Sequence, residues 1–430
     1  MEVSYSTGTT TTFDLVLCLA QAVDLVSPLV ADHHKRVAQI AYSLGRQMNL
    51  PEDDLVDLVI AAALHDVGGL TRSDRLDALD FEYQDPFGHA VMGYLLLKPF
   101  APFENSAQMV RFHHVAWQHG AGAQLDGVPV PTGSHLLHLA DRAAVLIDPQ
   151  RDVLEQAGDI VEKISAQAGE RFVPQQVEAF EALAQKEAFW LDAVFLQDLH
   201  YLNRNLQWRE LEISSDHLLG LGNLFRRVID FRSRFTAGHS AGVAATAEAL
   251  ARLSGFSEED CRMMHLAGLL HDLGKLAVPA EILEKPDKLT REEYAVMRRH
   301  TYYTYHILEP LKMLNVVTQW GAFHHERIDG QGYPFHLQGV DLPLGARIVS
   351  VADVFTALTE DRPYRKGLGV NEALKILSEA ARRRQVDGEL VAVVREHFDD
   401  LNQIRINARQ AAREEYHQFV ETAAQLTHKE

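Results

Sequence analysis

The sequence predicts an all-α protein in which one helical bundle occurs twice in tandem. The stretch that begins at His33 is repeated at His239, and the same offset of 206 residues relates His65 to His271. Segments such as 243–253 place apolar residues three and four positions apart, the spacing of one helix face. Neither copy shows the alternation of a strand. A long internal repeat of helical segments therefore predicts two bundles.

Four segments follow along the chain. They are a first bundle over residues 13–185, a helical linker over 186–230, a second bundle over 231–400 and a C-terminal helix over 401–430. The linker has helical periodicity without a Gly/Ser- or Pro-rich stretch, so we expect a rigid connection. Gly68 and Gly274 follow the two His-Asp pairs, where we expect them to cap helix C-termini.

Composition limits the function classes. A net charge of −19 in 430 residues disfavours binding to nucleic-acid polymers or anionic membranes, because phosphate surfaces recruit clustered Lys and Arg. Two cysteines exclude a disulfide framework, and the N-terminus lacks a basic signal segment, so we predict a cytoplasmic protein. The apolar stretch 13–30 is broken by Asp14, Gln21 and Asp24, which predicts an amphipathic helix and no membrane span.

A set of imidazole and carboxylate side chains recurs in both copies. In the second copy the candidate metal ligands are His239, His271, Asp272, His300, His324, His325 and Asp353. In the first copy they are His33, His65, Asp66, His89, His113, His114 and Asp141. A core role accounts for a single buried histidine, but it does not account for the same set twice.

These side chains predict a pair of metal ions. Imidazole with carboxylate suits divalent transition metals such as Fe and Mn. Seven candidate ligands exceed one tetrahedral site, so we expect two ions about 3.5–4 Å apart in the second copy. Adjacent helical residues project about 100° apart, which leaves Asp272 free to bridge both ions. The complete set in the first copy predicts further metal there.

The motifs of the second copy resemble the HD-GYP subclass of HD-domain metal-dependent phosphohydrolases. The matching stretches are HSAGVA at 239–244, HDLGK at 271–275, His300, HHERIDGQGYP at 324–334 and VADVFTALTEDRPYR at 351–365. The resemblance covers about residues 231–400. The first copy resembles a plain HD domain that lacks the GYP signature.

The resemblance implies hydrolysis of a cyclic dinucleotide, cyclic di-GMP or the hybrid cyclic GMP–AMP, to the linear dinucleotide. A metal-bridged hydroxide would attack phosphorus, with Asp272 and Lys275 as the catalytic side chains. Lys275 would bind phosphate or protonate the departing sugar oxygen. The implied substrate contacts are Gly332, Tyr333, Arg362 and Arg365. Phe235 stands where some relatives carry a glutamate that builds a third metal site, which favours two metals and the linear product.

The first copy departs from this pattern. Gly69 replaces Lys275, and no GYP loop follows His113-His114. Three roles stay open: hydrolysis of a smaller phosphomonoester, binding of a regulatory ligand, or a metal-stabilised scaffold. We favour regulation or a secondary phosphatase activity. His34 is expected to face solvent, because the repeat assigns ligation to His33.

Two alternatives stay open for the whole chain. It could be an HD-type nucleotide phosphohydrolase, or a signalling adaptor that binds a cyclic dinucleotide without hydrolysing it. Signalling-protein partners and a homodimer paired through the linker are further expectations. Base specificity and metal identity are not readable from the sequence.

Overall fold

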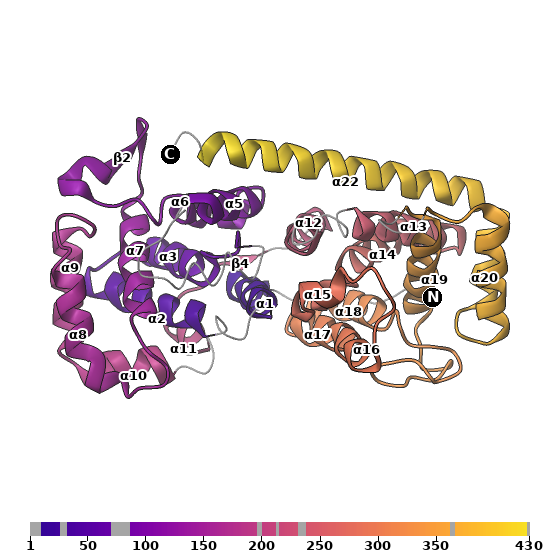
Figure 1. The fold of residues 1–430 in the computed structure, drawn as a ribbon, viewed down its shortest axis with the longest axis horizontal. Helices are drawn as coiled ribbons and strands as arrows, with labels where there is room; N and C mark the ends of the chain where they lie inside the picture. Colours follow the sequence, from indigo (N-terminus) through magenta and orange to yellow (C-terminus); the bar gives the residue numbers. More distant parts are fainter. Residues whose placement is uncertain are drawn as a thin grey trace. The chain divides into compact units, whose positions relative to one another are not determined.

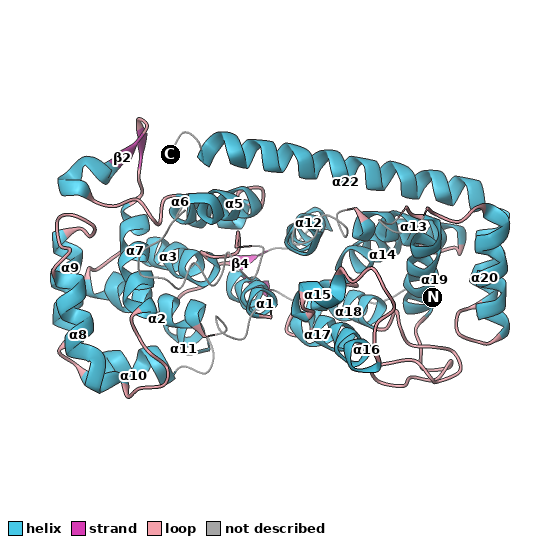
Figure 2. Ribbon diagram, viewed as in Figure 1, coloured by secondary structure: helices cyan, strands magenta, loops and turns pink. Residues whose placement is uncertain are grey.

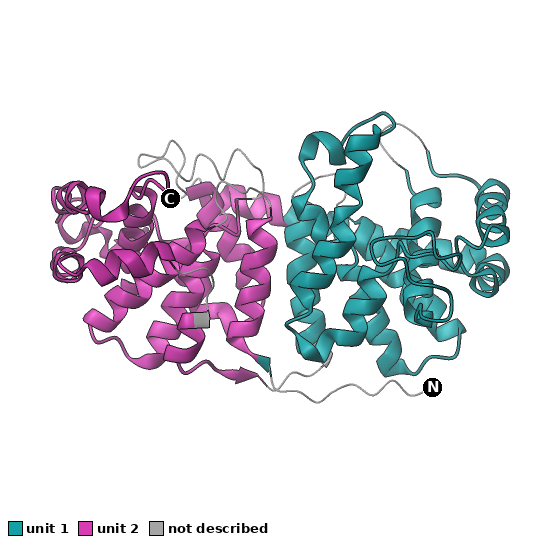
Figure 3. Ribbon diagram, turned by 90° about the horizontal axis from the view of Figure 1, so that it is seen from below, with its two compact units in different colours: residues 1–10, 212–418 teal, residues 11–211, 419–430 magenta. Residues whose placement is uncertain are grey.

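The computed structural model describes residues 10–25, 32–69, 87–195, 200–211, 215–230, 238–361 and 366–427. Helices dominate these residues, with a few two-residue strands (Figures 1 and 2). The chain divides into two compact units (Figure 3). We call Thr11–Leu211 with Phe419–Glu430 the first domain, and Met1–Thr10 with Glu212–Gln418 the second domain. The prediction of an all-α protein with two helical domains is confirmed.

The first domain contains the first copy of the repeat. Its helices are α1 (Thr12–Asp24), α2 (His33–Gln47), α3 (Glu52–Leu64), α5 (Phe87–Leu97), η1 (Ala101–Phe103), α6 (Glu104–Arg111), η2 (Gln118–Ala123), α7 (Thr132–Val145), α8 (Val153–Ser165), α9 (Pro174–Ala184), α10 (Glu187–Phe195) and α11 (His200–Asn205). Short strands lie at β1 (Thr10–Thr11), whose first residue is counted with the second domain, β2 (Gln124–Leu125), β3 (Val128–Pro129) and β4 (Glu210–Leu211). Strands β2 and β3 pair antiparallel. Helix α3 packs on α2 and α7, and its residues 55–64 are all buried.

The second domain contains the second copy. Its helices are α12 (Ser215–Asp230), α13 (His239–Leu253), α14 (Glu258–Leu270), η3 (Leu273–Ala277), α15 (Ala280–Leu283), α16 (Arg291–Met297), α17 (Arg299–Leu308), η4 (Lys312–Leu314), α18 (Asn315–Ala322), α19 (Leu344–Thr359), α20 (Val370–Arg382), α21 (Gly388–Glu396) and α22 (Phe398–Thr427), of which the residues from Phe419 on are counted with the first domain. The side chain of Ser257 accepts a hydrogen bond from the backbone of Asp260 and starts α14. A Cβ on Gly268 would lie 2.4 Å from the Cα of Ala244, so α13 and α14 approach closely. This packing brings the ligand-bearing ends of α13 and α14 together.

The segment predicted as a linker contains α10, α11, β4 and α12, and the boundary between the two domains falls after Leu211. The exact segment bounds stay a prediction. Helix α22 begins at Phe398, where residues 401–430 were expected to form the last helix. Among the helices in the described part of the chain, none has the length and apolar character needed to cross a bilayer.

Candidate metal centre

The seven predicted ligands of the second domain lie at the ends or faces of five helices. His239 opens α13, His271 and Asp272 follow α14, His300 lies on α17, His324 and His325 follow α18, and Asp353 lies on α19. They form two groups whose ligand atoms lie within 4.8 Å of one another: His239, His271 and Asp353 form one, and His300, His324 and His325 form the other. The structure thus brings the predicted residues to one place.

Asp272 lies between the two groups. Its Oδ2 is 3.1 Å from Nε2 of His271, in the first group. Its Oδ1 is 3.5 Å from Nε2 of His300 and 4.0 Å from Nε2 of His324, in the second group. One carboxylate therefore faces both sets of imidazoles.

Backbone hydrogen bonds orient three of the imidazoles. Nδ1 of His271, His300 and His324 lies 2.8, 2.7 and 2.7 Å from the carbonyl oxygen three residues earlier in the chain. Because a carbonyl only accepts, Nδ1 carries the proton in each ring. The lone pair then lies on Nε2, which faces the cluster, as metal ligation by imidazole requires.

The protonation states suit a cation. Burial lowers the pKa of His300 to about 3 and that of His325 to about 4, so both rings are neutral at pH 7. Burial alone would raise the pKa of Asp272, but His271 and Lys275 outweigh it and hold that carboxyl well below its usual range. The group of His300, His324 and His325 therefore offers neutral imidazoles beside the ionised carboxylate of Asp272.

His239 has an outer partner that sequence reasoning missed. Its Nδ1 is 3.1 Å from Oε2 of Glu360, and its Nε2 is 3.3 Å from Oδ1 of Asp353. Burial alone would lower the pKa of His239, but the two carboxylates raise it to about 10. Glu360 follows Asp353 by seven residues, two helical turns, so the spacing was a signal that could have identified it.

Unsatisfied atoms show that the residues fit metal ions. Nε2 of His271 and Oδ1 of Asp272 are buried, and neither forms a hydrogen bond with the described residues. Buried polar atoms without partners cost free energy, and native proteins rarely leave them unpaired. Both atoms are electron-pair donors directed into the cluster, and a bound cation would satisfy them. The donor set suits divalent transition metals.

The two glycines predicted to cap helices have another role. Helix α14 ends at Leu270, and Gly274 lies inside η3. A Cβ on Gly274 would lie 1.9 Å from the carbonyl oxygen of His300, and one on Gly68 would lie 2.1 Å from that of His89. The capping prediction was wrong, because these glycines permit close approach of the segment that carries the His-Asp pair to the next ligand helix.

Glu326 organises the GYP loop, and sequence reasoning did not identify it. Its side chain is 1% exposed and accepts hydrogen bonds from the backbone N–H groups of Phe335, His336 and Leu337 at 2.6, 3.1 and 3.0 Å. A Cβ on Gly332 would lie 2.3 Å from the backbone nitrogen of Arg327, so only glycine fits there. No periodicity points to Glu326, because it follows the histidine pair in a turn.

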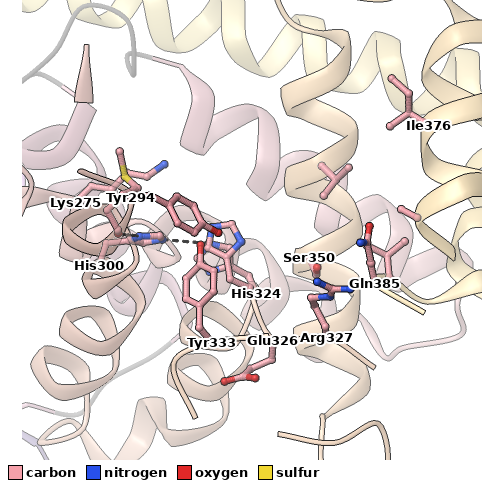
Figure 4. A pocket seen from close by; sticks show the side chains of 15 residues that line it. Lys275, Tyr294, His300, His324, Glu326, Arg327, Tyr333, Ser350, Ile376 and Gln385 are labelled. Carbon is pink, nitrogen blue, oxygen red and sulfur yellow. Dashed lines mark hydrogen bonds between the residues drawn. The ribbon is translucent and has the colours of Figure 1, made fainter. Parts of the chain in front are cut away.

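A cavity of about 550 Å³ opens beside the cluster. Lys275, Tyr294, His300, His324 and Tyr333 lie at one side of it, and Arg327, Ser350 and Gln385 lie at the other (Figure 4). Nζ of Lys275 lies 2.5 Å from Oδ2 of Asp272. The ring centroid of Tyr333 lies 5.0 Å from that of His325. The predicted substrate contacts Arg362 and Arg365, and Phe235, lie outside the described residues.

The first domain gathers its predicted ligands in the same way. His33, His65 and Asp66 form one group within 4.8 Å, and His89, His113 and His114 form another. Nε2 of His33 and of His65 lies 3.1 and 3.6 Å from Oδ1 of Asp141. The expectation that His34 faces solvent was wrong: its side chain is 1% exposed, because Asp24 holds the ring against the cluster.

Comparisons with known proteins agree with this geometry. Residues 30–146 and residues 223–390 each match the HD domain. The chain is 30% identical over 406 residues to 3'3'-cGAMP-specific phosphodiesterase 1 of Vibrio cholerae serotype O1. The aligned residues cover 90% of this chain and 92% of the relative. The chain is 27% identical over 420 residues to 3'3'-cGAMP-specific phosphodiesterase 3 of the same organism, with 85% and 90% covered.

Two further likenesses concern one part of the chain and the fold. The chain is 41% identical over 182 residues to the cyclic di-GMP phosphodiesterase response regulator RpfG of Xanthomonas campestris pv. campestris, which covers 41% of this chain and 47% of the relative. The crystal structure of a cyclic GMP-AMP specific phosphodiesterase of V. cholerae, V-cGAP3, matches with a TM-score of 0.61 and 23% identity over 93% of this chain and 98% of that one. The latter shows a shared fold.

Proposed function

We propose, from the premise that the chain belongs to the HD-GYP family of HD-domain phosphohydrolases, that its second domain is a metal-dependent phosphodiesterase for a cyclic dinucleotide. The observation that carries this proposal is Asp272, whose two oxygens face separate groups of imidazoles beside a cavity. Two divalent ions held there would supply Lewis acidity and lower the pKa of a water molecule. Fe or Mn suits these ligands.

The ligand assignment divides the seven side chains between two ions. His239, His271 and Asp353 would hold one ion, and His300, His324 and His325 would hold the other. Asp272 would bridge them. Metal number and each ligand's role are part of the proposal, and the distances between the ligand atoms support it.

The chain's own cations would bind the phosphate. Lys275 lines the cavity next to Asp272, and its side chain is 22% exposed, so Nζ can reach a substrate oxygen by a small rotation. Arg327 lines the far side of the same cavity. These cations give an anionic substrate local compensation in a chain of net charge −19. Lys275 is also placed to protonate the departing sugar oxygen.

The cavity and the GYP loop support a nucleotide as the substrate. A volume of about 550 Å³ is within the range of pockets that bury small ligands. Tyr333 and Tyr294 offer aromatic surface, and Gln385 offers amide groups to a base edge. Glu326 would keep Tyr333 in place by holding the backbone just after it.

We favour the hybrid cyclic GMP–AMP over cyclic di-GMP. The two relatives named for 3'3'-cGAMP match the chain over 90% and 85% of its length, whereas the RpfG match covers 41%. The relatives that match this chain over both of its domains are therefore the ones named for the hybrid substrate. The proposed product is the linear dinucleotide.

The test is product analysis on purified protein loaded with Mn²⁺ or Fe²⁺. Cyclic GMP–AMP, cyclic di-GMP and cyclic di-AMP are each incubated with the protein, and products are identified by mass spectrometry. We expect linear GMP–AMP dinucleotide to form fastest, and His271→Ala/Asp272→Ala to form none. If the metal-loaded protein binds a cyclic dinucleotide tightly and cleaves none, the chain is a signalling adaptor and the proposed enzymatic function is wrong.

A further inference from the structure

The two domains differ at one position next to the first ligand histidine. The offset of 206 residues pairs Asp24 with Asp230 and His34 with Ser240. In the second domain the hydroxyl of Ser240 donates a hydrogen bond to Oδ1 of Asp230 at 3.0 Å. In the first domain Nδ1 of His34 donates to Oδ1 of Asp24 at 2.9 Å. The first domain thus keeps the aspartate and places an imidazole where the second has a hydroxyl.

His34 turns its other nitrogen toward the cluster of the first domain. The hydrogen bond to Asp24 places the proton on Nδ1, so Nε2 carries the lone pair. This Nε2 is buried, forms no hydrogen bond with the described residues, and lies 3.9 Å from Oδ2 of Asp66. Ligand bonds of about 2.1 Å place two ligand atoms of one ion about 3–4 Å apart. The separation fits shared ligation.

Other atoms of the same cluster lack partners as well. Nε2 of His65, Nε2 of His113 and Oδ1 of Asp66 are buried and form no hydrogen bonds within the described ranges. His65 and His113 donate from Nδ1 to the carbonyl oxygens of Ala62 and Val110 at 2.9 and 2.6 Å. The lone pairs of these rings therefore also face the cluster. This is the arrangement of a cation site.

The ligand aspartates differ in exposure. The Asp141 side chain is 1% exposed, and the equivalent Asp353 side chain is 16% exposed. The next residue in the first domain is Arg142, which is fully buried and holds Oδ2 of Asp141 with its Nη2 at 2.7 Å. The corresponding residue in the second domain is Val354, which lines the cavity. The first domain thus has a buried guanidinium, paired with the ligand carboxylate, at the position where the second domain has an uncharged side chain that lines the cavity.

We propose that the first domain holds its own metal centre, that His34 is an additional nitrogen ligand of it, and that this centre stabilises the domain without turning over a phosphate ester. Structural metal sites are closed by protein ligands, whereas catalytic sites keep a position open. One more imidazole than in the second domain favours ions such as Zn²⁺ and Fe²⁺ over Mn²⁺. The inference concerns the first domain and stands independently of the function proposed for the second.

The test isolates the first domain's metal in the full chain. The His271→Ala/Asp272→Ala background removes ligands of the second domain. Asp24→Asn and His34→Ser are compared in it, with His135→Ser as the control, because His135 is 3% exposed and its ring lies against Trp117, 5.4 Å between centroids. Bound Zn²⁺ is measured by mass spectrometry after dialysis, and the visible spectrum is recorded with Co²⁺ as the probe.

We expect the background protein to retain Zn²⁺ and to unfold at a higher temperature with Zn²⁺ than without it. Asp24→Asn should weaken Zn²⁺ binding roughly 10–100-fold, the usual effect of losing a partner behind a ligand histidine. His34→Ser should change the Co²⁺ spectrum, and His135→Ser should not. If the His271→Ala/Asp272→Ala protein does not fold, Asp24→Asn, His34→Ser and His135→Ser are made in the otherwise unaltered chain. The number of ions bound per chain by each variant is then compared with the number bound by the unaltered protein.

Two results would overturn the inference. Equal Zn²⁺ retention and an unchanged Co²⁺ spectrum in His34→Ser would remove His34 from the ligand set. Turnover of any nucleotide phosphate ester by the metal-loaded background protein would show that the first domain's centre is catalytic. Neither result bears on whether the second domain cleaves cyclic dinucleotides, which is assayed with its own ligands intact.

Discussion

Replacing Asp272 with asparagine should remove the metal pair of the second domain with little change of shape. The asparagine side chain keeps the size of the carboxylate but loses its negative charge. Asp272 is 3% exposed, and its oxygens lie 3.1 and 3.5 Å from Nε2 of His271 and His300. Any ion held by those nitrogens would lie within a few ångströms of the lost charge.

The expected loss follows from Coulomb's law. Two unit charges about 4 Å apart interact by about 4 kcal/mol at an effective dielectric constant of about 20. Since roughly 1.4 kcal/mol corresponds to a factor of ten, this is about three orders of magnitude in metal affinity for each unit of cation charge. We therefore expect Asp272→Asn to lose the ions of the second domain on dialysis and to lose hydrolysis with them.

The assay counts ions per chain after dialysis and follows cleavage of cyclic GMP–AMP. Asp260→Asn is the matched control, because Asp260 lies in the first turn of α14, at the end of that helix away from Asp272, is 6% exposed and accepts a hydrogen bond from Ser257. The control should retain ions and activity. Retention of both ions by Asp272→Asn, with cleavage within tenfold of the unaltered protein, would refute the bridging role.

Three further predictions concern residues around the cluster. Lys275→Met should lower kcat roughly 100-fold, the usual cost of losing one group that stabilises developing charge, while the amount of metal bound per chain stays constant. An unchanged kcat would show that Lys275 has no part in the reaction. Glu326→Gln should lower the free energy of unfolding by roughly 2–3 kcal/mol and speed amide hydrogen exchange at 335–337, because charged hydrogen bonds are lost; exchange at unaltered rates would contradict this. Because the pKa of His239 is raised to about 10, the metal-free ring holds its proton at pH 8 and must release it when it binds a metal ion. Metal binding is measured at pH 8 by calorimetry in buffers of different ionisation enthalpy, and His239→Gln should release about one proton fewer than the unaltered protein. Equal proton release by the two proteins would contradict the assignment of His239 as a ligand.

The repeat made the fold and the ligand set readable from the sequence. Because His33 and His239 open equivalent helices, offsets of 206 to 212 residues paired the candidate ligands of the two copies without any knowledge of packing. The period of the apolar residues predicted helices, and the burial of Val153, Gln156, Ile160 and Ile164 in α8, at spacings of three and four, agrees with it. Residue type and spacing were enough to predict which histidines and aspartates lie together in each domain.

Three features depended on contacts between distant segments, which periodicity does not encode. Gly274 is needed for a close approach to the carbonyl of His300, 26 residues later, and a capping role was the wrong local reading. Glu326 accepts hydrogen bonds from a loop nine to eleven residues away. His34 was assigned to solvent because the repeat assigns ligation to His33, whereas Asp24 turns its ring inward.

Anomalous scattering from crystals soaked in Mn²⁺ tests the central claim most directly, because it places each ion relative to named side chains. Two peaks should lie in the second domain on either side of Asp272. One should contact His239, His271 and Asp353, and the other His300, His324 and His325. A single peak, or ions bound away from Asp272, would contradict the two-metal site on which the proposed phosphodiesterase depends.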